Sequence, residues 1–183
     1  MPRAGLSAEV LVGVALDLVD EKGLEALSLA AVADRAGVAA PSLYKHVTSV
    51  AELRELMAVT VVRQLTTMCA TAVMGRSRED AVEALMRHYR AFVVAHPGRY
   101  ALVPVNALQV PALAEAGAEL LGVFGAVLRA YGLEGSAATH AIRRMRATAH
   151  GFAVLEASGG FGLPEDVDSS FDQVVTMVLR SLE

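Results

Sequence analysis

The chain has 183 residues, of which 54% are hydrophobic, and its 16 Lys and Arg against 20 Asp and Glu give a net charge of −4. The mean hydropathy of +0.44 is high, yet no unbroken run of about 18 apolar residues occurs, so we expect no membrane span. The single cysteine, Cys69, excludes an internal disulfide and a cysteine-based metal cluster.

Much of the apolar excess is alanine, which accounts for 33 residues and is the strongest helix former among the amino acids. The start of the chain carries Glu9, Asp17 and Asp20 within an amphipathic pattern, unlike a secretory signal peptide. We therefore expect a cytoplasmic, all-α protein. The acidic net charge argues mildly against nucleic acid as a partner.

Hydrophobic residues recur at helical spacing along most of the chain, with Gly, Pro and Ser between the helical stretches. The first helix is expected to follow Ser7 and end at Gly23, and the second to begin after Ser28, because serine caps helix N-termini and glycine ends helices. Seven further helices are predicted at about 40–46, 49–74, 77–95, 97–107 (short and irregular), 111–131, 136–158 and 168–182. The prediction is an all-α fold of about nine helices.

Residues 28–47 read SLAAVADRAGVAAPSLYKHV and predict a helix-turn-helix. Two short helices that cross sharply need a small residue at the crossing, a turn residue able to take positive φ, and apolar anchors on both sides. Ala33, Gly37, Val38 and Leu43 supply these in order. The pattern alone is typical of any helix-turn-helix, including pairs that do not bind DNA.

Two features of this motif favour contacts with DNA phosphates. Ser28 would cap the second helix and leave the amides of Leu29 and Ala30 facing a phosphate at the positive end of the helix dipole. A single turn also contains three hydrogen-bond donors, Tyr44, Lys45 and His46, as phosphate contacts along the edge of a groove require. The alternative is that Tyr44 packs between helices and His46 is an ordinary surface histidine.

Base reading has few candidates. The exposed start of the recognition helix and the second helix would present only small residues, without an Arg, Asn or Gln that could bind a base through two hydrogen bonds: Ala30, Ala39, Ala40, Pro41 and Ser42. Methyl contacts with thymine, Ser42, and Arg3 reaching into a minor groove are the remaining means. We expect selectivity that is modest or based on DNA shape.

The motif resembles a known family. PSLYKHV at 41–47, and a first helix that ends at Gly23 before Leu27, Ser28 and Leu29, are similar to the N-terminal domain of the TetR family of bacterial transcription regulators over about residues 7–60. The resemblance implies a DNA-binding domain at 1–50 and a ligand-binding and dimerisation domain at 51–183. It also implies a homodimer on a palindromic operator of double-stranded DNA, a small and largely apolar effector that releases a repressor, and no cofactor.

A second resemblance covers AHGF at 149–152, LEA at 155–157 and GGFGLP at 159–164. These residues are similar to the C-terminal domain type named for a Trp-His-Gly triplet, with Ala149 at the position of the tryptophan. The loss of the indole predicts more room near this position.

Effector and dimer residues are predicted from side-chain type and spacing. Methionine and aromatic side chains adapt to irregular apolar ligands, and histidine can orient a ligand, although each of these residues could equally be part of the core. The candidates for an effector pocket are Met57, Met68, Cys69, Met86, Tyr89, Phe92, Tyr100, Phe124 and His150.

Apolar stripes on the last two helices predict a four-helix interface between two copies, with completion of a monomer's core as the alternative. The stripes comprise Ile142, Met145, Ala149, Phe152, Phe171, Val174, Val175, Val178, Leu179 and Leu182.

Two further predictions concern charge and chemistry. Arg143, Arg144 and Arg146 are read as a solvated helix face, with recognition of an acidic group as the alternative. Motifs of metalloproteases, P-loop enzymes and serine hydrolases are absent from the sequence, so we expect no enzyme. The alternative function is a dimeric helical ligand-binding or protein-interaction module with little or no sequence-specific DNA binding, since base readers are few and residues 1–50 carry four basic against six acidic residues.

Overall fold

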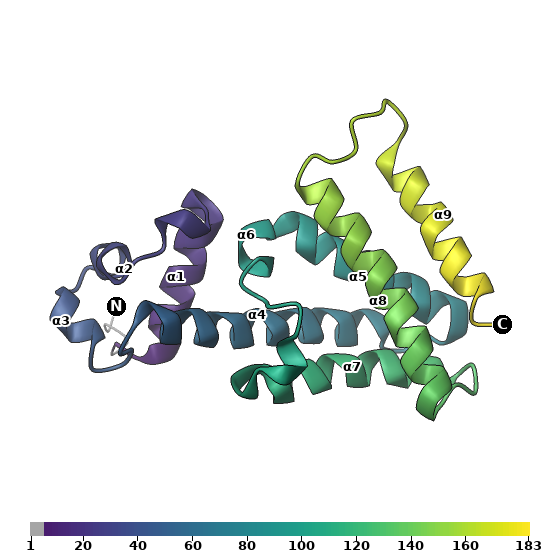
Figure 1. The fold of residues 1–183 in the computed structure, drawn as a ribbon, viewed down its shortest axis with the longest axis horizontal. Coiled ribbons are helices and arrows are strands. Elements are labelled where there is room, and N and C mark those ends of the chain that lie inside the picture. Colours follow the sequence, from purple (N-terminus) through teal and green to yellow (C-terminus); the bar gives the residue numbers. More distant parts are fainter. Residues whose placement is uncertain (1–5) are drawn as a thin grey trace. The chain divides into compact units, whose positions relative to one another are not determined.

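The computed structural model describes residues 6–183 and, within them, contains nine α-helices, three short 3-10 helices and no strand (Figure 1). The prediction of an all-α fold with an N-terminal helix-turn-helix is confirmed. The chain forms two compact units, one made by Met1–Val62 with Gly98–Glu115 and the other by Arg63–Pro97 with Ala116–Glu183.

The first unit begins with α1 (Ala8–Lys22), α2 (Leu29–Ala36) and α3 (Ala40–Leu43), with a 3-10 turn at Leu24–Ala26 between the first two. The hydroxyl of Ser7 accepts the Val10 N–H at 3.2 Å, and that of Ser28 accepts the Ala31 N–H at 3.1 Å. Both predicted N-caps are therefore present. The core of this part consists of side chains that are at most 2% exposed, among them Leu11, Leu16, Val32, Leu43 and Leu53.

The long helix α4 (Val50–Val73) starts in the first unit and continues into the second. Its sequence lacks a glycine or proline, which explains why it runs for 24 residues without a break. The predicted helix at 49–74 agrees with it to within one residue at each end.

A later segment of the chain returns to the first unit. It contains most of α6 (Pro97–Tyr100) and the 3-10 turns Ala107–Gln109 and Pro111–Leu113. A Cβ atom on Gly98 would lie 3.0 Å from Cγ1 of Val19, so the glycine permits a close approach to α1. Arg99 holds the same contact by binding Asp20 (Nη2–Oδ2 2.7 Å) and Asp17 (Nη2–Oδ1 3.3 Å).

The second unit contains α5 (Arg78–Ala95), all but the first two residues of α7 (Ala114–Arg129), α8 (Gly135–Ala157) and α9 (Val167–Arg180). Both α8 and α9 pack on α5 and on each other. Tyr89 of α5 meets Phe124 of α7 edge to face, with ring centroids 6.4 Å apart. Phe171 of α9 is fully buried, which is typically worth about 1.5–3 kcal/mol for a side chain of this kind.

Three predicted helices are shorter than expected. The one predicted at 97–107 is helical only over Pro97–Tyr100 as α6. The third stops at Leu43 and continues as a turn, in which the His46 N–H donates to the Leu43 carbonyl at 2.8 Å. The helix predicted from 111 starts as a 3-10 turn and becomes α7 only at Ala114. Local hydrogen bonds to the third preceding residue, from His46 to Leu43 and from Leu113 to Val110, tighten the chain at these last two boundaries.

By length and composition, α4 and the stretch Pro111–Arg129 are apolar enough to cross a membrane. Core helices of soluble proteins pass the same test, and α4 carries the charged residues Glu52, Arg54, Glu55 and Arg63 along its length. The composition of these two helices is therefore weak evidence for a membrane span.

Candidate nucleic-acid interface

The residues predicted to meet DNA lie mainly on the exposed side of the helix-turn-helix. Tyr44 is 58% exposed and Lys45 is also exposed, whereas His46 is half-buried. Ser28, Ala30, Ala39, Ala40 and Pro41 are exposed, and Leu29 and Ser42 are half-buried. Ala33 and Leu43 face the core, being 3% and 0% exposed. The motif thus separates an inner, apolar face from an outer face that a ligand can reach.

The turn between α2 and α3 depends on Gly37, which has φ +68° and ψ +33°. Its N–H donates to the Asp34 carbonyl at 3.1 Å, and the Val38 N–H donates to the Ala33 carbonyl at 3.1 Å. These bonds satisfy carbonyls that the end of a helix leaves open. Because side-chain-bearing residues rarely adopt this left-handed conformation, Gly37 sets the direction in which α3 leaves α2.

A capping box, which the sequence reading missed, fixes the start of α4 just after the recognition turn. The Ser49 hydroxyl accepts the Glu52 N–H at 3.1 Å, and the Glu52 carboxylate accepts the Thr48 N–H at 2.6 Å and the Thr48 hydroxyl. Hydrogen bonds from Thr48 lower the pKa of Glu52 below its ordinary value. The signal was present in the sequence, as serine followed three residues later by glutamate.

Arginine side chains form ion pairs with acids of α1, and these pairs offset part of the negative charge of this region. Glu21 receives two hydrogen bonds from the Arg35 guanidinium, one of them 2.6 Å long, and this lowers the pKa of Glu21. Asp17 and Asp20 share Arg99. Three acids of this region therefore have cationic partners. Arg3 lies outside the described residues.

The residues predicted to line an effector pocket are distributed over both units. Met57 and Tyr100 belong to the first unit, and the other seven belong to the second. Within the second unit Met68 and His150 are half-buried and the rest are buried: Cys69, Met86, Tyr89, Phe92 and Phe124. The structure brings Tyr89 and Phe124 into contact. Their role toward an effector stays a prediction.

Two of these candidates have shifted pKa values. Burial raises the pKa of the Cys69 thiol to about 12, so the side chain behaves as a small apolar group at neutral pH. Burial, together with the charge of Arg146, lowers the pKa of His150. Among residues 6–183 no group of three or more His, Cys, Asp and Glu could hold a metal ion.

The prediction that the apolar stripes of the last two helices contact a second copy needs a correction. Six of its ten residues are at most 5% exposed within one chain, namely Met145, Ala149, Phe171, Val175, Val178 and Leu182. These side chains form the core of the second unit, so they are not available to a second copy. Helical periodicity identifies the face that is buried but not the surface that covers it. For the half-buried members, Ile142, Phe152, Val174 and Leu179, contact with a second copy stays a prediction.

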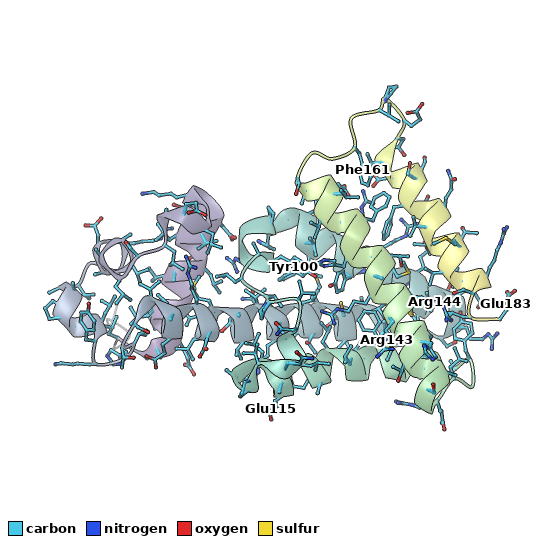
Figure 2. The ribbon with its side chains drawn as sticks, in the orientation of Figure 1. Tyr100, Glu115, Arg143, Arg144, Phe161 and Glu183 are labelled. Carbon is cyan, nitrogen blue, oxygen red and sulfur yellow. The ribbon has the colours of Figure 1, made fainter. Side chains whose placement is uncertain are left out.

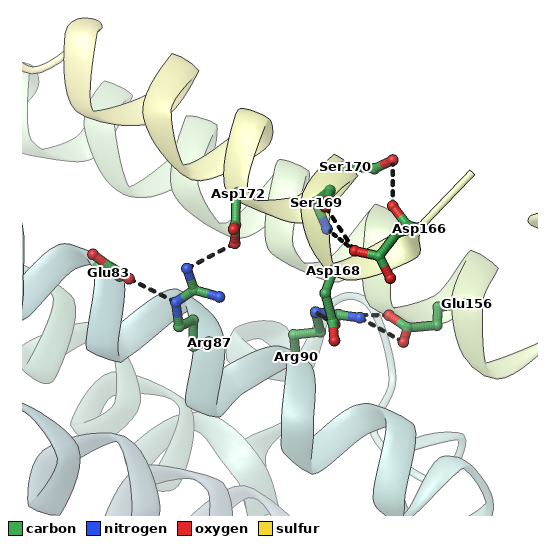
Figure 3. Close-up of polar contacts among 9 residues, drawn as sticks. All are labelled: Glu83, Arg87, Arg90, Glu156, Asp166, Asp168, Ser169, Ser170 and Asp172. Carbon is green, nitrogen blue, oxygen red and sulfur yellow. Dashed lines mark hydrogen bonds and ion pairs between the residues drawn. The ribbon is translucent and has the colours of Figure 1, made fainter.

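An ionic cluster ties α5 to α8 and α9 (Figure 3). The Arg90 guanidinium binds Glu156 through two hydrogen bonds of 2.6 and 2.7 Å and binds Asp168 at 2.7 Å. The same group lies over the rings of Phe152 and Phe171, at 5.5 and 4.8 Å from their centroids. Hydrogen bonding to Glu156 raises the pKa of Arg90. Sequence reading missed this cluster, because its partners lie 66 and more residues from Arg90.

Comparison with known proteins gives two family matches. Residues 11–57 match the family described as bacterial regulatory proteins, tetR family, and residues 82–178 match the one described as tetracyclin repressor-like, C-terminal domain. The chain is 36% identical to Rv0681 of Mycobacterium tuberculosis, an uncharacterized HTH-type transcriptional regulator, over 97% of this chain and 80% of that protein.

Solved structures of Streptomyces coelicolor proteins share the fold. The transcriptional regulator SCO7222, described as a TetR, superposes with a TM-score of 0.78 at 22% identity and covers 97% of both chains. ActR, a TetR family protein solved in complex with (S)-DNPA, superposes with a TM-score of 0.73 at 20% identity and covers 98% of both chains.

Proposed function

Because the chain belongs to the TetR family of HTH-type transcriptional regulators, we propose that it is a repressor, acting in the cytoplasm as a homodimer on a palindromic operator. A small, largely apolar effector releases the DNA. The observation that carries the proposal is the exposure of Ser28, which caps α2, and of Tyr44 and Lys45, which directly follow α3.

Phosphate contacts supply most of the affinity in this proposal. The Tyr44 hydroxyl and the Lys45 ammonium bind backbone phosphates, and so do the free amides at the start of α2. Ala39, Ala40 and Pro41 approach the bases and offer methyl and methylene groups only. Specificity therefore rests on DNA shape and on thymine methyl contacts.

The functional division we propose places the DNA-binding surface in residues 1–50 and the effector-binding and dimerisation surfaces in residues 51–183. The segment Gly98–Glu115 joins the compact unit that contains the DNA-binding surface. Arg99 in this segment forms an ion pair with Asp20 of α1, and the chain continues into the second unit at both ends of the segment. A movement of the end of α5 or the start of α7 on effector binding would therefore be transmitted to α1 through this segment. The complex of ActR with (S)-DNPA supports an effector for this chain as well.

The alternative, an interaction module without sequence-specific DNA binding, draws on the exposed alanines at positions 39 and 40. One experiment separates the two functions. Retardation of the DNA upstream of the protein's own gene is measured at low and at moderate salt, with Tyr44→Ala as the matched variant. The regulator predicts retardation that Tyr44→Ala weakens, whereas no retardation at either salt by a folded protein supports the interaction module.

A further inference from the structure

One face of α5 meets α8 and α9 close to the loop that connects these two helices. The residues of this face recur at helical spacing and are Arg87, Arg90, Ala91, Val94 and Ala95. Glu156 lies in the last turn of α8 and Asp168 in the first turn of α9. Figure 2 shows Phe161 at this end of the two helices and Arg144 toward their other end.

Together these residues line a hollow of about 350 Å³, which we call the α5–α9 hollow. Ligand pockets usually measure about 300–1,000 Å³, so this one suits a small ligand. Ala91, Val94 and Ala95 are exposed and make part of its wall apolar. The rest of the wall consists of charged side chains. The hollow contains no residue of the predicted effector pocket.

Each nitrogen of the Arg90 guanidinium already has an acidic partner. Nε and Nη2 donate to the Glu156 carboxylate at 2.6 and 2.7 Å, and Nη1 lies 2.7 Å from Oδ1 of Asp168. Both carboxylate oxygens of Glu156 are used in this way. Arg90 and Glu156 therefore form part of the wall and hold Asp168 in place.

Two atoms of the charged groups around the hollow lack a partner among residues 6–183. Arg87 donates from Nε to Glu83 at 2.8 Å and from Nη2 to Asp172 at 2.7 Å, which leaves Nη1 unused. Asp168 binds Arg90 through Oδ1, which leaves Oδ2 unused. Figure 3 shows Nη1 on the side of the Arg87 guanidinium that is turned toward Arg90 and Asp168. A ligand can therefore find one free donor group and one free acceptor here.

The charges of the wall select against a ligand with a single charge. A carboxylate alone could accept from Arg87 but would also face the carboxylates of Asp168 and Glu156. An amine alone could donate to Asp168 but would face two guanidinium groups and leave Nη1 of Arg87 without an acceptor. A zwitterion provides a partner for both free atoms. Arg87 and Arg90 are neighbours on one helix face, which suits a ligand whose two charges lie close together.

From these observations we propose that the α5–α9 hollow binds a free α-amino acid with an apolar side chain. Its carboxylate accepts hydrogen bonds from Nη1 of Arg87, its ammonium group donates to Oδ2 of Asp168, and its side chain packs on Val94 and the neighbouring alanines. The bound amino acid links α5 to α9 and stabilises the second unit, because a ligand that binds only the folded state raises the stability of that state. The proposal goes beyond the proposed function and does not depend on DNA binding.

A series of leucine analogues tests the charge requirement. Calorimetric titration and thermal unfolding of the full chain are carried out with L-leucine, with 4-methylpentanoate, which lacks the amino group, and with 3-methylbutylamine, which lacks the carboxylate. We expect leucine to bind and to raise the unfolding temperature, and each analogue to bind at least about tenfold more weakly, since each loses a hydrogen-bonded charge. No binding of leucine at millimolar concentration, or an analogue that binds as tightly as leucine, overturns the proposal.

Two variants test the location. Ala91→Met fills the hollow from an exposed position of α5, and Asp168→Asn removes the charge that holds the ammonium group while Glu156 still binds Arg90. Both should weaken leucine binding about tenfold. Ala126→Met, at an exposed alanine of α7 outside the hollow, is the matched control and leaves the affinity unchanged.

Circular dichroism verifies that each variant is folded. Unchanged leucine affinity in folded Ala91→Met would place leucine elsewhere and overturn the proposal. DNA retardation by a wild-type protein that does not bind leucine overturns the amino-acid site alone. Leucine binding by a wild-type protein that does not retard DNA supports the site and contradicts only the proposed function.

Discussion

The Arg99 guanidinium lies 2.7 Å from the Asp20 carboxylate, which joins α6 to α1 across 79 residues of sequence. The Arg99 side chain is only 15% exposed, so solvent screens this ion pair less than it screens a surface pair. The ion pair therefore connects the two separate stretches of chain that form the first unit.

We expect Arg99→Ala to lower the free energy of unfolding by about 1–3 kcal/mol, the usual range for losing hydrogen bonds to a charged group. The amides of α1 should then exchange their hydrogens faster, because the helix loses its partner on that side. Chemical denaturation and hydrogen exchange measure the two effects, with the exposed Arg76→Ala as control. Unchanged exchange in α1 would show that Arg99 does not fasten this helix.

Gly37 and Gly13 form a matched pair for testing the turn. Gly37 has φ +68°, whereas Gly13 lies inside α1 with open space around it. Gly37→Ala should destabilise the protein by about 1–2 kcal/mol, the penalty for a left-handed residue with a Cβ atom, and should weaken DNA binding. Gly13→Ala should stabilise it by about 0.5–1 kcal/mol, since glycine is a poor residue within a helix. Thermal unfolding of both variants provides the comparison, and equal effects would contradict the assigned role of Gly37.

Tyr44 and Ala40 are predicted to affect DNA binding in different ways. Tyr44→Ala removes a phosphate contact and should weaken binding to all sequences alike, by about tenfold. Ala40→Arg places a guanidinium at the base-reading surface and should change which sequences bind best. Competition among DNA sequences distinguishes the two effects. A sequence-dependent loss in Tyr44→Ala would mean that the phenol contacts bases.

The capping box at the start of α4 makes stability dependent on pH. The folded-state pKa of Glu52 is lowered, so its contribution to stability is fully present above the ordinary value of 4.5 and is lost as the pH falls through the lower, folded-state pKa. Glu52→Gln should therefore be less stable than wild type at pH 7, and the gap should close in acid below pH 4.5. Unfolding curves across this range test it. Glu55→Gln, exposed on the same helix, is the control, and a gap that persists in acid would rule out the carboxylate as its source.

The features that the sequence predicts correctly are those that depend on interactions between residues close together in the chain. The N-caps at Ser7 and Ser28 and the glycine turn at Gly37 are all signals within a few residues, and each is present in the structure. The boundaries of α3 and α7 differ from the predicted ones, because 3-10 bonds near Leu43 and Pro111 shorten both helices.

Contacts between distant residues could not be predicted in the same way. The spacing of Phe171 and Val175 predicts an apolar stripe, but only the fold shows that the chain itself covers it. Nothing near Arg99 or Arg90 in the sequence indicates that their partners are Asp20 and Glu156. Such pairs depend on how the helices meet, which periodicity does not encode.

The central claim is that α2 and α3 read DNA as part of a symmetric regulator, and selection of bound DNA from a random-sequence pool tests it most directly. The account predicts an enriched inverted repeat whose half-sites lie about one helical turn apart, with weak base preferences and a common A/T-rich shape signal. A folded wild-type protein that enriches no sequence over the starting pool would contradict it.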